Sequence, residues 1–418
     1  MPASATRTPV LQLDYVRDQF PALTDDWIFF DNAGGSQILK AVGDRLQDFL
    51  YTSNVQLGAS YGVSQLASQR VAEGSEAMAT LINAADPSEV VLGNSTSSVL
   101  RILAHCWGQS LQPGDEIIVT NSDHEANISP WRDLQSRGVT LKTWCVNPET
   151  FELDLADLAA LLTDRTRLVA VTQASNLLGT LNLIRPIADL VHDRGALLCV
   201  DGVAYAPHRL IDVQAWDVDF YAFSLYKVYG PHLGLLYGKR EHLLPLPGFN
   251  HSFIGPEVIP YKLQPGGVSY ELTASLPGIV DYLQGLAHHH WGADTAPDLR
   301  GQLAQAFDLI AAHEAKLSDR LLTYLRTKPQ VRIIGCDTAD PTRRVPTIAF
   351  VVAGRKSSEI PPHLDAQQIG IRYGHFYAPQ LVDDLGLAEQ DGVVRVSMVH
   401  YNRLEECDRL IAALDTVL

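Results

Sequence analysis

The chain has 418 residues, 46% of them hydrophobic, and its 48 Asp and Glu against 32 Lys and Arg give a net charge of −16. A chain of this size can bury a large core and form two domains. It carries no basic stripe, so the composition argues against nucleic acid and against an anionic membrane surface as partners.

Five cysteines are spread widely along the sequence without a CxxC pair: Cys106, Cys145, Cys199, Cys336 and Cys407. An odd, scattered set argues against a disulfide framework and favours a reducing compartment. The N-terminus, MPASATRTPVLQLD, has no apolar core segment, and no stretch approaches the roughly 18 apolar residues of a membrane-spanning helix. These features predict a cytoplasmic protein.

The first third of the chain begins with an arm that leads into a short helix, LDYVRDQF. WIFFDNAGGS (27–36) predicts a strand that ends in a glycine-rich turn, and helical patterns follow over 38–53 and 64–84. Short apolar strands then alternate with helices, at 116–120, 167–172, 196–200, 219–224 and 233–238.

Nearly continuous apolar strands between helices indicate a parallel sheet that is covered on both faces. Ligands of such sheets bind beyond the carboxyl ends of the strands. Asp201 and Lys227 both lie just past predicted strand ends, so we expect one crevice to hold both side chains.

The pattern changes after residue 242. Pro- and Gly-rich loops are predicted over 242–272, followed by a helix in SLPGIVDYLQGLAHHH and a longer helix over 298–326. The strands VRIIG, TIAFVV and GVVRVSM, a helix near HLDAQQIG and a terminal helix, EECDRLIAALDTVL, then predict a small α+β domain. We expect an N-terminal arm (1–20) that packs on the small domain, a large domain (21–290) and a small C-terminal domain (291–418).

Three consecutive histidines, His288, His289 and His290, end one predicted helix. Adjacent side chains on a helix point in different directions, so the three cannot bind one ion together. We therefore expect a polar helix end and no metal site.

Lys227 lies in AFSLYKVYGPHLG, a run of aromatic, aliphatic and glycine residues. An unpaired ammonium in an apolar setting is costly unless it loses its proton or finds partners. A neutral lysine amine is a nucleophile for carbonyls. Taken alone, however, the pattern fits a lysine that reaches water from a strand end at least as well, so other residues must decide.

Pyridoxal phosphate requires a lysine that forms a Schiff base, a carboxylate at the pyridine nitrogen, a phosphate cradle and a flat group stacked on the ring. Lys227 is the candidate lysine, and Asp201, 26 positions earlier in CVDGVAYAPH, is the candidate carboxylate. Thr96 and Ser97 open a predicted helix, whose amides and dipole attract an anion. They are the candidate cradle.

Two further residues complete this set. His124, in NSDHEANISPW, is the candidate stacking group, and Ser224, three residues before the lysine, would add a hydroxyl to the cradle. Simpler interpretations remain open: Thr96 and Ser97 would also serve as helix caps, and His124 would also fit as an ordinary loop histidine.

Seven motifs in order carry a resemblance to a known family: DNAGGS, GDEIIVTNSDHEANISPW, VTQASNLLGT, VDG, DVDFYAFSLYKVYGPHLG, IRYGHFYAP and VRVSMVHYN. From about residue 13 to the C-terminus the sequence resembles the class V aminotransferases of fold-type I, and most closely their cysteine desulfurase branch. The resemblance implies an α/β fold with a mostly parallel seven-stranded sheet and a smaller α+β domain. It also implies pyridoxal 5′-phosphate as cofactor and an amino acid as substrate.

The resemblance further implies roles for single residues. Asn176 would contact the 3′-oxygen side of the cofactor or the substrate. Arg395 would bind the substrate carboxylate in a fork geometry, and Arg372 would lie nearby on a mobile loop; a structural salt bridge is the alternative for Arg395. Gly267 and Ser269, in PGGVSYE, would reach the phosphate of the neighbouring subunit, which implies a homodimer with shared sites.

Several positions depart from the desulfurase pattern. Tyr377 stands where a persulfide-forming loop cysteine is expected, Ala204 replaces a glutamine, and the histidine expected near residue 57 is missing from VQLGASYG. Tyr226 replaces the histidine before the lysine, although its hydroxyl would still reach the phosphate. Tyrosine cannot hold a persulfide, so these changes affect the expected reaction more than cofactor binding. His375 and Tyr377 would act as acid or base or pack the loop.

We therefore expect a pyridoxal-phosphate enzyme that acts on an amino acid, with Lys227 and His124 as catalytic residues. Cleavage of a carbon–sulfur bond in cysteine or a cysteine derivative is the favoured reaction, because a lyase that releases sulfur directly needs no loop cysteine. An aminotransferase or epimerase is the first alternative, and a non-catalytic cofactor-binding protein is the second.

Overall fold

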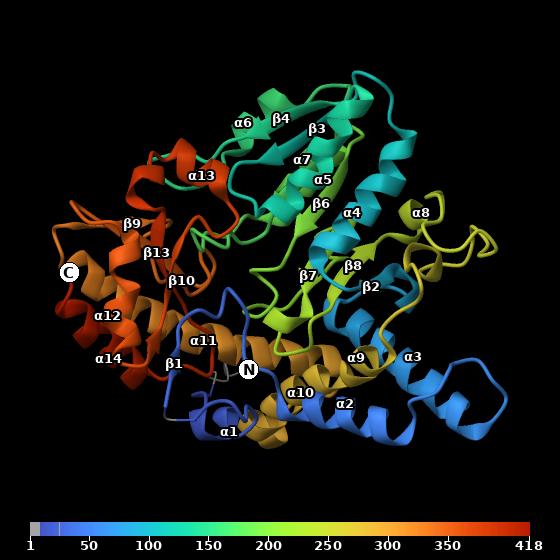
Figure 1. Cartoon of the computed structure of the whole chain (residues 1–418), viewed down its shortest axis with the longest axis horizontal. Coiled ribbons are helices and arrows are strands. Elements are labelled where there is room, and N and C mark those ends of the chain that lie inside the picture. The colour runs from blue at the N-terminus through green and yellow to red at the C-terminus, as the bar shows by residue number, and fades with distance from the viewer. Residues whose placement is uncertain (1–8, 25) are drawn as a thin grey trace, which may run out of the picture.

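The structure is a computed structural model that describes residues 9–24 and 26–418. Its centre is a seven-stranded sheet with the strand order β2-β8-β7-β6-β5-β3-β4 (Figure 1). The strands are β2 Val90–Gly93, β3 Glu116–Thr120, β4 Thr140–Trp144, β5 Thr166–Thr172, β6 Leu197–Asp201, β7 Phe220–Ser224 and β8 Gly234–Gly238.

Every neighbouring pair in this sheet is parallel except the two pairs that include β8, which runs antiparallel to β2 and to β7. A short connection joins β7 to β8, whereas a parallel neighbour requires a longer crossover. The strand therefore turns back on β7. The predicted α/β fold with a mostly parallel seven-stranded sheet is confirmed.

Fourteen α-helices surround the sheets in the described part of the chain. They are α1 Leu13–Arg17, α2 Lys40–Thr52, α3 Gly62–Ile82, α4 Thr96–Trp107, α5 Ser129–Arg132, α6 Leu155–Leu161, α7 Ile184–His192, α8 Arg240–Leu243, α9 Tyr270–Ser275, α10 Pro277–Trp291, α11 Leu299–Arg326, α12 Pro361–Asp365, α13 Pro379–Asp384 and α14 Leu404–Asp415. The helices predicted over 38–53, 64–84 and 298–326 are confirmed to within two residues at each end.

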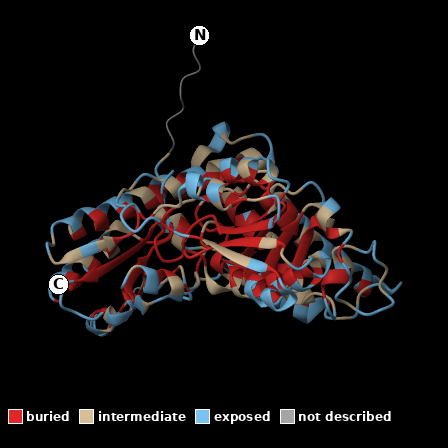
Figure 2. Ribbon diagram, turned by 90° about the horizontal axis from the view of Figure 1, so that it is seen from above, coloured by how far each residue is buried: buried red, intermediate tan, exposed pale blue. Residues whose placement is uncertain are grey.

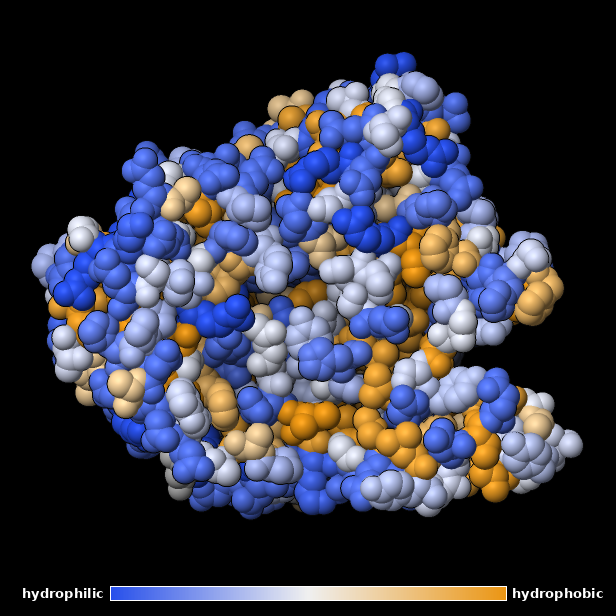
Figure 3. Space-filling view, viewed as in Figure 1, coloured by the Kyte–Doolittle hydropathy of each residue, from blue (hydrophilic) through white to orange (hydrophobic). Residues whose placement is uncertain are grey.

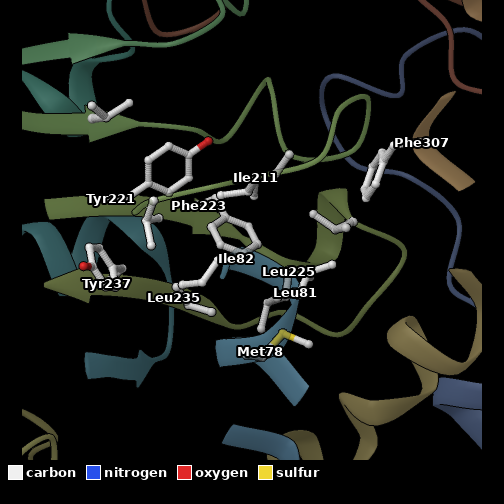
Figure 4. Packing of buried hydrophobic residues seen from close by; sticks show 14 of the residues in the cluster. Met78, Leu81, Ile82, Ile211, Tyr221, Phe223, Leu225, Leu235, Tyr237 and Phe307 are labelled. Atoms are coloured by element: carbon white, nitrogen blue, oxygen red, sulfur yellow. The ribbon is translucent and has the colours of Figure 1, made fainter. Parts of the chain in front are cut away.

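The central sheet is buried on both faces because alternate residues of each strand enter different cores. Along β5, Val169 and Val171 join a cluster that includes residues of α3, α7, α10 and α11. Leu168 and Ala170 join the opposite cluster, which includes residues of α4 and α5. Figure 4 shows part of the first cluster, where Met78 of α3 packs below the strands. Burial on both faces accounts for strands that are apolar at every position.

The C-terminal part of the chain forms a second, smaller sheet with the order β12-β13-β10-β9, all of it antiparallel. Its strands are β9 Val331–Ile334, β10 Thr347–Val352, β12 Arg372–Gly374 and β13 Val393–Ser397. This sheet packs with α11 and α14 around a core of its own, and Figure 2 shows buried residues concentrated in the interior of both parts.

One strand crosses between the predicted domains. β1 (Ile28–Phe29) pairs in parallel with β11 (Ile369–Gly370), so a segment from the predicted large domain packs with the smaller part. The boundaries at residues 20 and 290 stay a prediction. The helix predicted near HLDAQQIG is shorter than expected, since α12 ends at Asp365 and Gln368 adopts a φ of 59° before β11 begins.

The described part of the N-terminal arm lies against both α10 and the C-terminal segment; residues 1–8 fall outside the described residues. Tyr15 stacks on His289 with ring centroids 3.9 Å apart, and the backbone N–H of Gln12 donates to His290 Nε2 at 2.9 Å. Arg17 pairs with Glu406 at 2.8 Å. The histidine run therefore contacts the arm.

Residues 9–24 and 26–418 contain neither a candidate metal site nor a candidate membrane-spanning helix. No group of three or more His, Cys, Asp or Glu side chains is arranged to hold a metal ion. No described helix is both long enough and apolar enough to span a bilayer.

Candidate active site

Two neighbouring strands of the central sheet end at the same edge and bring the predicted residues together. Asp201 is the last residue of β6, and Ser224 is the last residue of β7. A 3-10 turn, Leu225–Lys227, follows directly. The two strand ends and this turn border a small cavity. Its walls include Thr96, Ser97, His124, Asn176, Asp201, Ser224, Tyr226 and Lys227.

Lys227 points into this cavity with only 7% of its surface exposed. Burial, helped by the positive charge of Arg395, lowers the pKa of Lys227 to about 8, although the negative charge of Asp201 opposes the shift. Desolvation disfavours the charged form of an amine. The Lys227 amine therefore loses its proton at a lower pH than a solvent-exposed lysine does.

Asp201 is buried, and one of its carboxylate oxygens accepts a hydrogen bond from the backbone N–H of Val203 at 2.8 Å. Burial raises the pKa of Asp201 to about 6. A second buried acid, Asp123, is raised to a pKa of about 8 by burial and by the nearby charge of Asp201. Two carboxyl groups that share a buried region resist ionising together, and a cationic group beside Asp201 would relieve that cost.

The N-terminus of α4 opens onto the cavity. The hydroxyl of Ser95 caps the helix by accepting from the Ser98 N–H at 3.1 Å, and Thr96 Oγ1 lies 2.7 Å from Ser224 Oγ. A Cβ atom added to Gly234 would lie 2.3 Å from the Thr96 nitrogen, so only glycine lets β8 approach the helix end this closely. Ser95, Thr96, Ser97 and Ser224 therefore line the same small cavity.

His124 has a defined tautomer. Its Nδ1 accepts a hydrogen bond from the Ala126 N–H at 3.0 Å. Burial and the positive charge of Lys227 lower the pKa of His124 to about 4, so the ring is neutral and carries its hydrogen on Nε2. The Tyr377 ring lies against it, with centroids 5.1 Å apart and planes tilted by 34°.

A wider cavity, with a volume of about 910 Å³, opens from Lys227 toward the smaller sheet. Arg395, on β13, is 2% exposed and lies in its wall. One terminal nitrogen, Nη1, donates to the Asn176 carbonyl at 3.0 Å, and the other, Nη2, donates to Asp31 at 2.9 Å. Among residues 9–24 and 26–418, nothing accepts a hydrogen bond from its buried Nε.

The remaining predicted residues lie around these cavities. Arg372 is exposed and donates to the second oxygen of Asp31 at 3.3 Å. Tyr226 stacks on His232 with centroids 4.7 Å apart. Gly267, with a φ of 90°, and Ser269 line neither cavity of their own chain, so their role in a neighbouring subunit stays a prediction.

The Aminotransferase class-V family profile matches residues 28–257 and 302–410. The chain belongs to this family. Class V aminotransferases are pyridoxal-phosphate-dependent enzymes, and the matched segments contain both strand ends, the N-terminus of α4 and the two arginines.

This class V enzyme is similar to its relatives over nearly its whole length. It is 46% identical to the aminotransferase-like protein FGM3 of Gibberella zeae, over 97% of this chain and 98% of that protein. It is 35% identical to the cysteine desulfurase-like protein ustD of Aspergillus flavus, over 98% and 91%. The crystal structure of the cysteine desulfurase CsdA (S-sulfonic acid) from Escherichia coli matches with a TM-score of 0.82 at 29% identity, over 97% and 98%. The resemblance to the desulfurase branch is confirmed.

Sequence reasoning missed two residues at the site of this class V enzyme. Asp31 bridges both arginines from the turn after β1, and Phe376 lies with its ring centroid 3.7 Å from the Arg395 guanidinium carbon. Both stand in motifs that were recognised, DNAGGS and IRYGHFYAP. The position of Asp31 directly before a predicted glycine-rich turn was the available sequence signal, and it did not identify the arginines as partners.

Proposed function

We propose that this enzyme binds pyridoxal phosphate in the smaller cavity, through Lys227, and cleaves a carbon–sulfur bond in cysteine or a cysteine derivative. When bound, the cofactor would withdraw electrons from the substrate Cα and so stabilise the carbanion left by proton removal. The proposal is supported by an amine, a carboxylate and an anion cradle that line one cavity.

The side chains fit the cofactor's chemistry. The α4 amides with Thr96, Ser97 and Ser224 would hold the phosphate, because helix N-termini attract anions. Asp201 would pair with the protonated ring nitrogen, which relieves the cost of its buried charge. His124 would stack on the ring as a neutral imidazole.

Further contacts are proposed for the cofactor and for the substrate. Tyr226 would hydrogen-bond the phosphate, Asn176 would lie at the 3′-oxygen side, and Arg395 would receive the substrate carboxylate. Arg372, more exposed, would bind the same end of the substrate. Gly267 and Ser269 of a second copy would complete the phosphate site.

The protein's own groups account for the proton transfer. Arg395 would orient the substrate through its carboxylate, because the fork of guanidinium N–H donors matches the two oxygens of a carboxylate. Lys227, whose pKa burial lowers to about 8, would accept the Cα proton in its free-amine form. Loss of that proton and of the sulfur group from Cβ, followed by water addition, converts cysteine to pyruvate, ammonia and sulfide.

The choice of a lyase rests on the residues that line the two cavities. Among the described residues, no cysteine lines either cavity, and Tyr377 occupies the loop at the mouth with 65% of its surface exposed. Only Cys145 among the five is exposed, and it lies outside both cavity walls. Sulfur would therefore leave directly, without a persulfide on the enzyme.

Aminotransfer is the second candidate function. The relative FGM3 is named aminotransferase-like, and the same Lys227, Asp201 and Arg395 arrangement would serve transamination. The two reactions differ in their products, because transamination consumes a keto acid and keeps the sulfur in the side chain.

Two apolar groups on one side of the molecule support the proposed homodimer. Leu50, Tyr51, Tyr61, Val63 and Leu66 are exposed around the tip of α2 and α3, and Phe249, Phe253, Val258 and Tyr261 are exposed on the loop after α8. Figure 3 shows a notch between these two projections. Exposed apolar patches of this kind mark interaction sites. The five free cysteines support a reducing, cytoplasmic location.

The test is product analysis with purified holoenzyme. L-cysteine and its S-alkyl derivatives are supplied without a keto acid, and pyruvate, ammonia and sulfide or thiol are measured. We expect all three products, unchanged by Cys145→Ser and abolished by Lys227→Ala. Turnover that requires a keto acid would reject the lyase. Borohydride reduction followed by peptide mass spectrometry should locate the cofactor on Lys227, and a label elsewhere would reject the cofactor assignment.

A further inference from the structure

Phe376 contacts Arg395, the buried arginine of the site. Its backbone adopts a conformation that phenylalanine does not favour. Its ring centroid lies 3.7 Å from the Arg395 guanidinium carbon, well within the range of a cation–π interaction. Phe376 has a φ of 49° and Tyr377 a φ of 58°. Left-handed backbone is unfavourable for bulky residues and persists only where surrounding contacts enforce it.

Two hydrogen bonds enforce this backbone. The Phe376 carbonyl accepts from Asn176 Nδ2 at 2.7 Å, and the Tyr377 carbonyl accepts from the Glu125 N–H at 2.7 Å. Each residue thus holds one wall of the site: Phe376 lies on Arg395 and Tyr377 lies beside His124. The loop that would carry a nucleophilic cysteine in a desulfurase is docked here by aromatic contacts.

Arg395 is thereby constrained in three directions. The Asn176 carbonyl and Asp31 hold its two terminal nitrogens, and the Phe376 ring covers one face of the guanidinium. A fixed guanidinium plane loses little freedom when it binds a carboxylate in a paired geometry. The same Asn176 side chain that would face the ligands is oriented by the Phe376 carbonyl.

We propose that Phe376 is a positioning residue, whose ring sets the Arg395 guanidinium for the α-carboxylate of the substrate. This inference rests on the proposed function, since it assumes an amino-acid substrate. Phe376 lines the wider cavity and not the smaller one. Its loss should therefore weaken ligands that carry an α-carboxylate and spare both cofactor binding and ligands that lack this group.

The test compares L-alanine with ethylamine, which differ only by the carboxylate. Each is titrated into holoenzyme, and binding is followed through the absorbance of the bound cofactor. We expect Phe376→Leu to weaken L-alanine about tenfold, equivalent to about 1.4 kcal/mol and within the range of a desolvated cation–π contact. Ethylamine affinity should stay within about twofold. Phe376→Tyr, which retains the ring, should restore L-alanine binding.

Phe151→Leu is the matched control. Phe151 also adopts left-handed backbone, with a φ of 58°, its ring centroid lies 5.7 Å from the guanidinium carbon of Arg332, and it lines neither cavity. Phe151→Leu should leave both affinities unchanged. The inference is overturned if Phe376→Leu weakens the binding of L-alanine and ethylamine equally, or if it leaves L-alanine binding unchanged. A wild-type protein that does not respond to L-alanine overturns the proposed function together with it.

Discussion

Arg372 and Arg395 occupy directly opposed positions on β12 and β13, and the carboxylate of Asp31 joins them. Like charges in directly opposed strand positions repel. Asp31 offers one oxygen to each guanidinium, at 3.3 Å to Arg372 and 2.9 Å to Arg395. A residue from the turn after β1 therefore stabilises a cationic pair more than 300 positions later in the sequence.

The first prediction concerns this bridge. Asp31→Ala should lower the free energy of unfolding by about 3 kcal/mol, because it leaves the buried Arg395 charge without its partner. We place the loss at the lower end for a buried pair because the Asp31 side chain is 28% exposed. Urea unfolding of the wild type and the variant measures the difference.

Arg372→Gln is the control for the bridge. It removes an exposed partner of the same carboxylate, so the loss should stay below about 1 kcal/mol. If Arg372→Gln lowers the free energy of unfolding as much as Asp31→Ala does, the pair of Asp31 with the buried Arg395 does not dominate. The three residues then act as a single unit.

The general position of the site could be predicted from the sequence because it depends on local patterns. Apolar runs identify the strands, and their carboxyl ends meet at one edge of a parallel sheet, so Asp201 and Lys227 were expected to lie together. The small polar residues before α4 similarly identify a helix N-terminus from composition alone.

Contacts between distant segments could not be predicted in this way. Asp31 and Arg395 are separated by 364 positions, and periodicity carries no information on which acidic residue reaches a given arginine. The contact of Phe376 with Arg395 depends on two consecutive left-handed residues, a conformation that the types Phe and Tyr do not favour. The antiparallel direction of β8 likewise depends on the path of the connection that follows β7.

The second prediction concerns the phosphate cradle. Gly234→Ala places a Cβ atom 2.2 Å from the Ser95 carbonyl carbon and 2.3 Å from the Thr96 nitrogen, so β8 or the start of α4 must move. Overpacking of this kind costs about 1–3 kcal/mol, and the displaced amides should weaken cofactor binding at least tenfold. Equilibrium dialysis of the cofactor and thermal unfolding measure both effects.

Gly43→Ala is the comparison for that experiment. Gly43 lies inside α2 with nothing within 4 Å of the added atom, so alanine should stabilise the helix by about 0.5–1 kcal/mol and leave cofactor affinity unchanged. Retained affinity in Gly234→Ala would show that the cradle does not bind the phosphate.

The third prediction concerns the buried Lys227 amine in protein freed of cofactor. Burial lowers its pKa from 10.5 to about 8, so between these values the unfolded chain binds a proton that the folded protein releases. Stability should therefore rise with pH from about 8 to about 10.5. Lys227→Met should be more stable than the wild type at pH 7, by up to about 3 kcal/mol, and the difference should shrink across this window. A constant difference, measured by urea unfolding at several pH values, would indicate that the amine is not desolvated.

The last prediction concerns His400, which joins two buried tyrosines behind the site. The Tyr229 hydroxyl donates to the Pro207 carbonyl at 2.8 Å and lies 3.0 Å from His400 Nδ1, and the Tyr282 hydroxyl lies 2.6 Å from Nε2. Since Tyr229 has only one hydrogen to donate, Nδ1 must carry the imidazole hydrogen, and Nε2 accepts from Tyr282. Burial, with the charges of His313 and His208, holds the pKa of His400 well below its usual value.

His400→Gln should lower the free energy of unfolding by about 2 kcal/mol at pH 8, because it disturbs the buried hydrogen bonds to the Tyr229 and Tyr282 hydroxyls. Below about pH 6.5 the unfolded chain protonates this histidine while the folded protein does not, so wild-type stability falls as the pH drops and the variant loses less. The gap between the two unfolding curves should therefore narrow from pH 6.5 toward pH 5, by up to about 1.4 kcal/mol for each pH unit. A gap that stays constant or widens would show that His400 takes up a proton within the folded protein, and the assigned pattern of donors and acceptors would then be wrong.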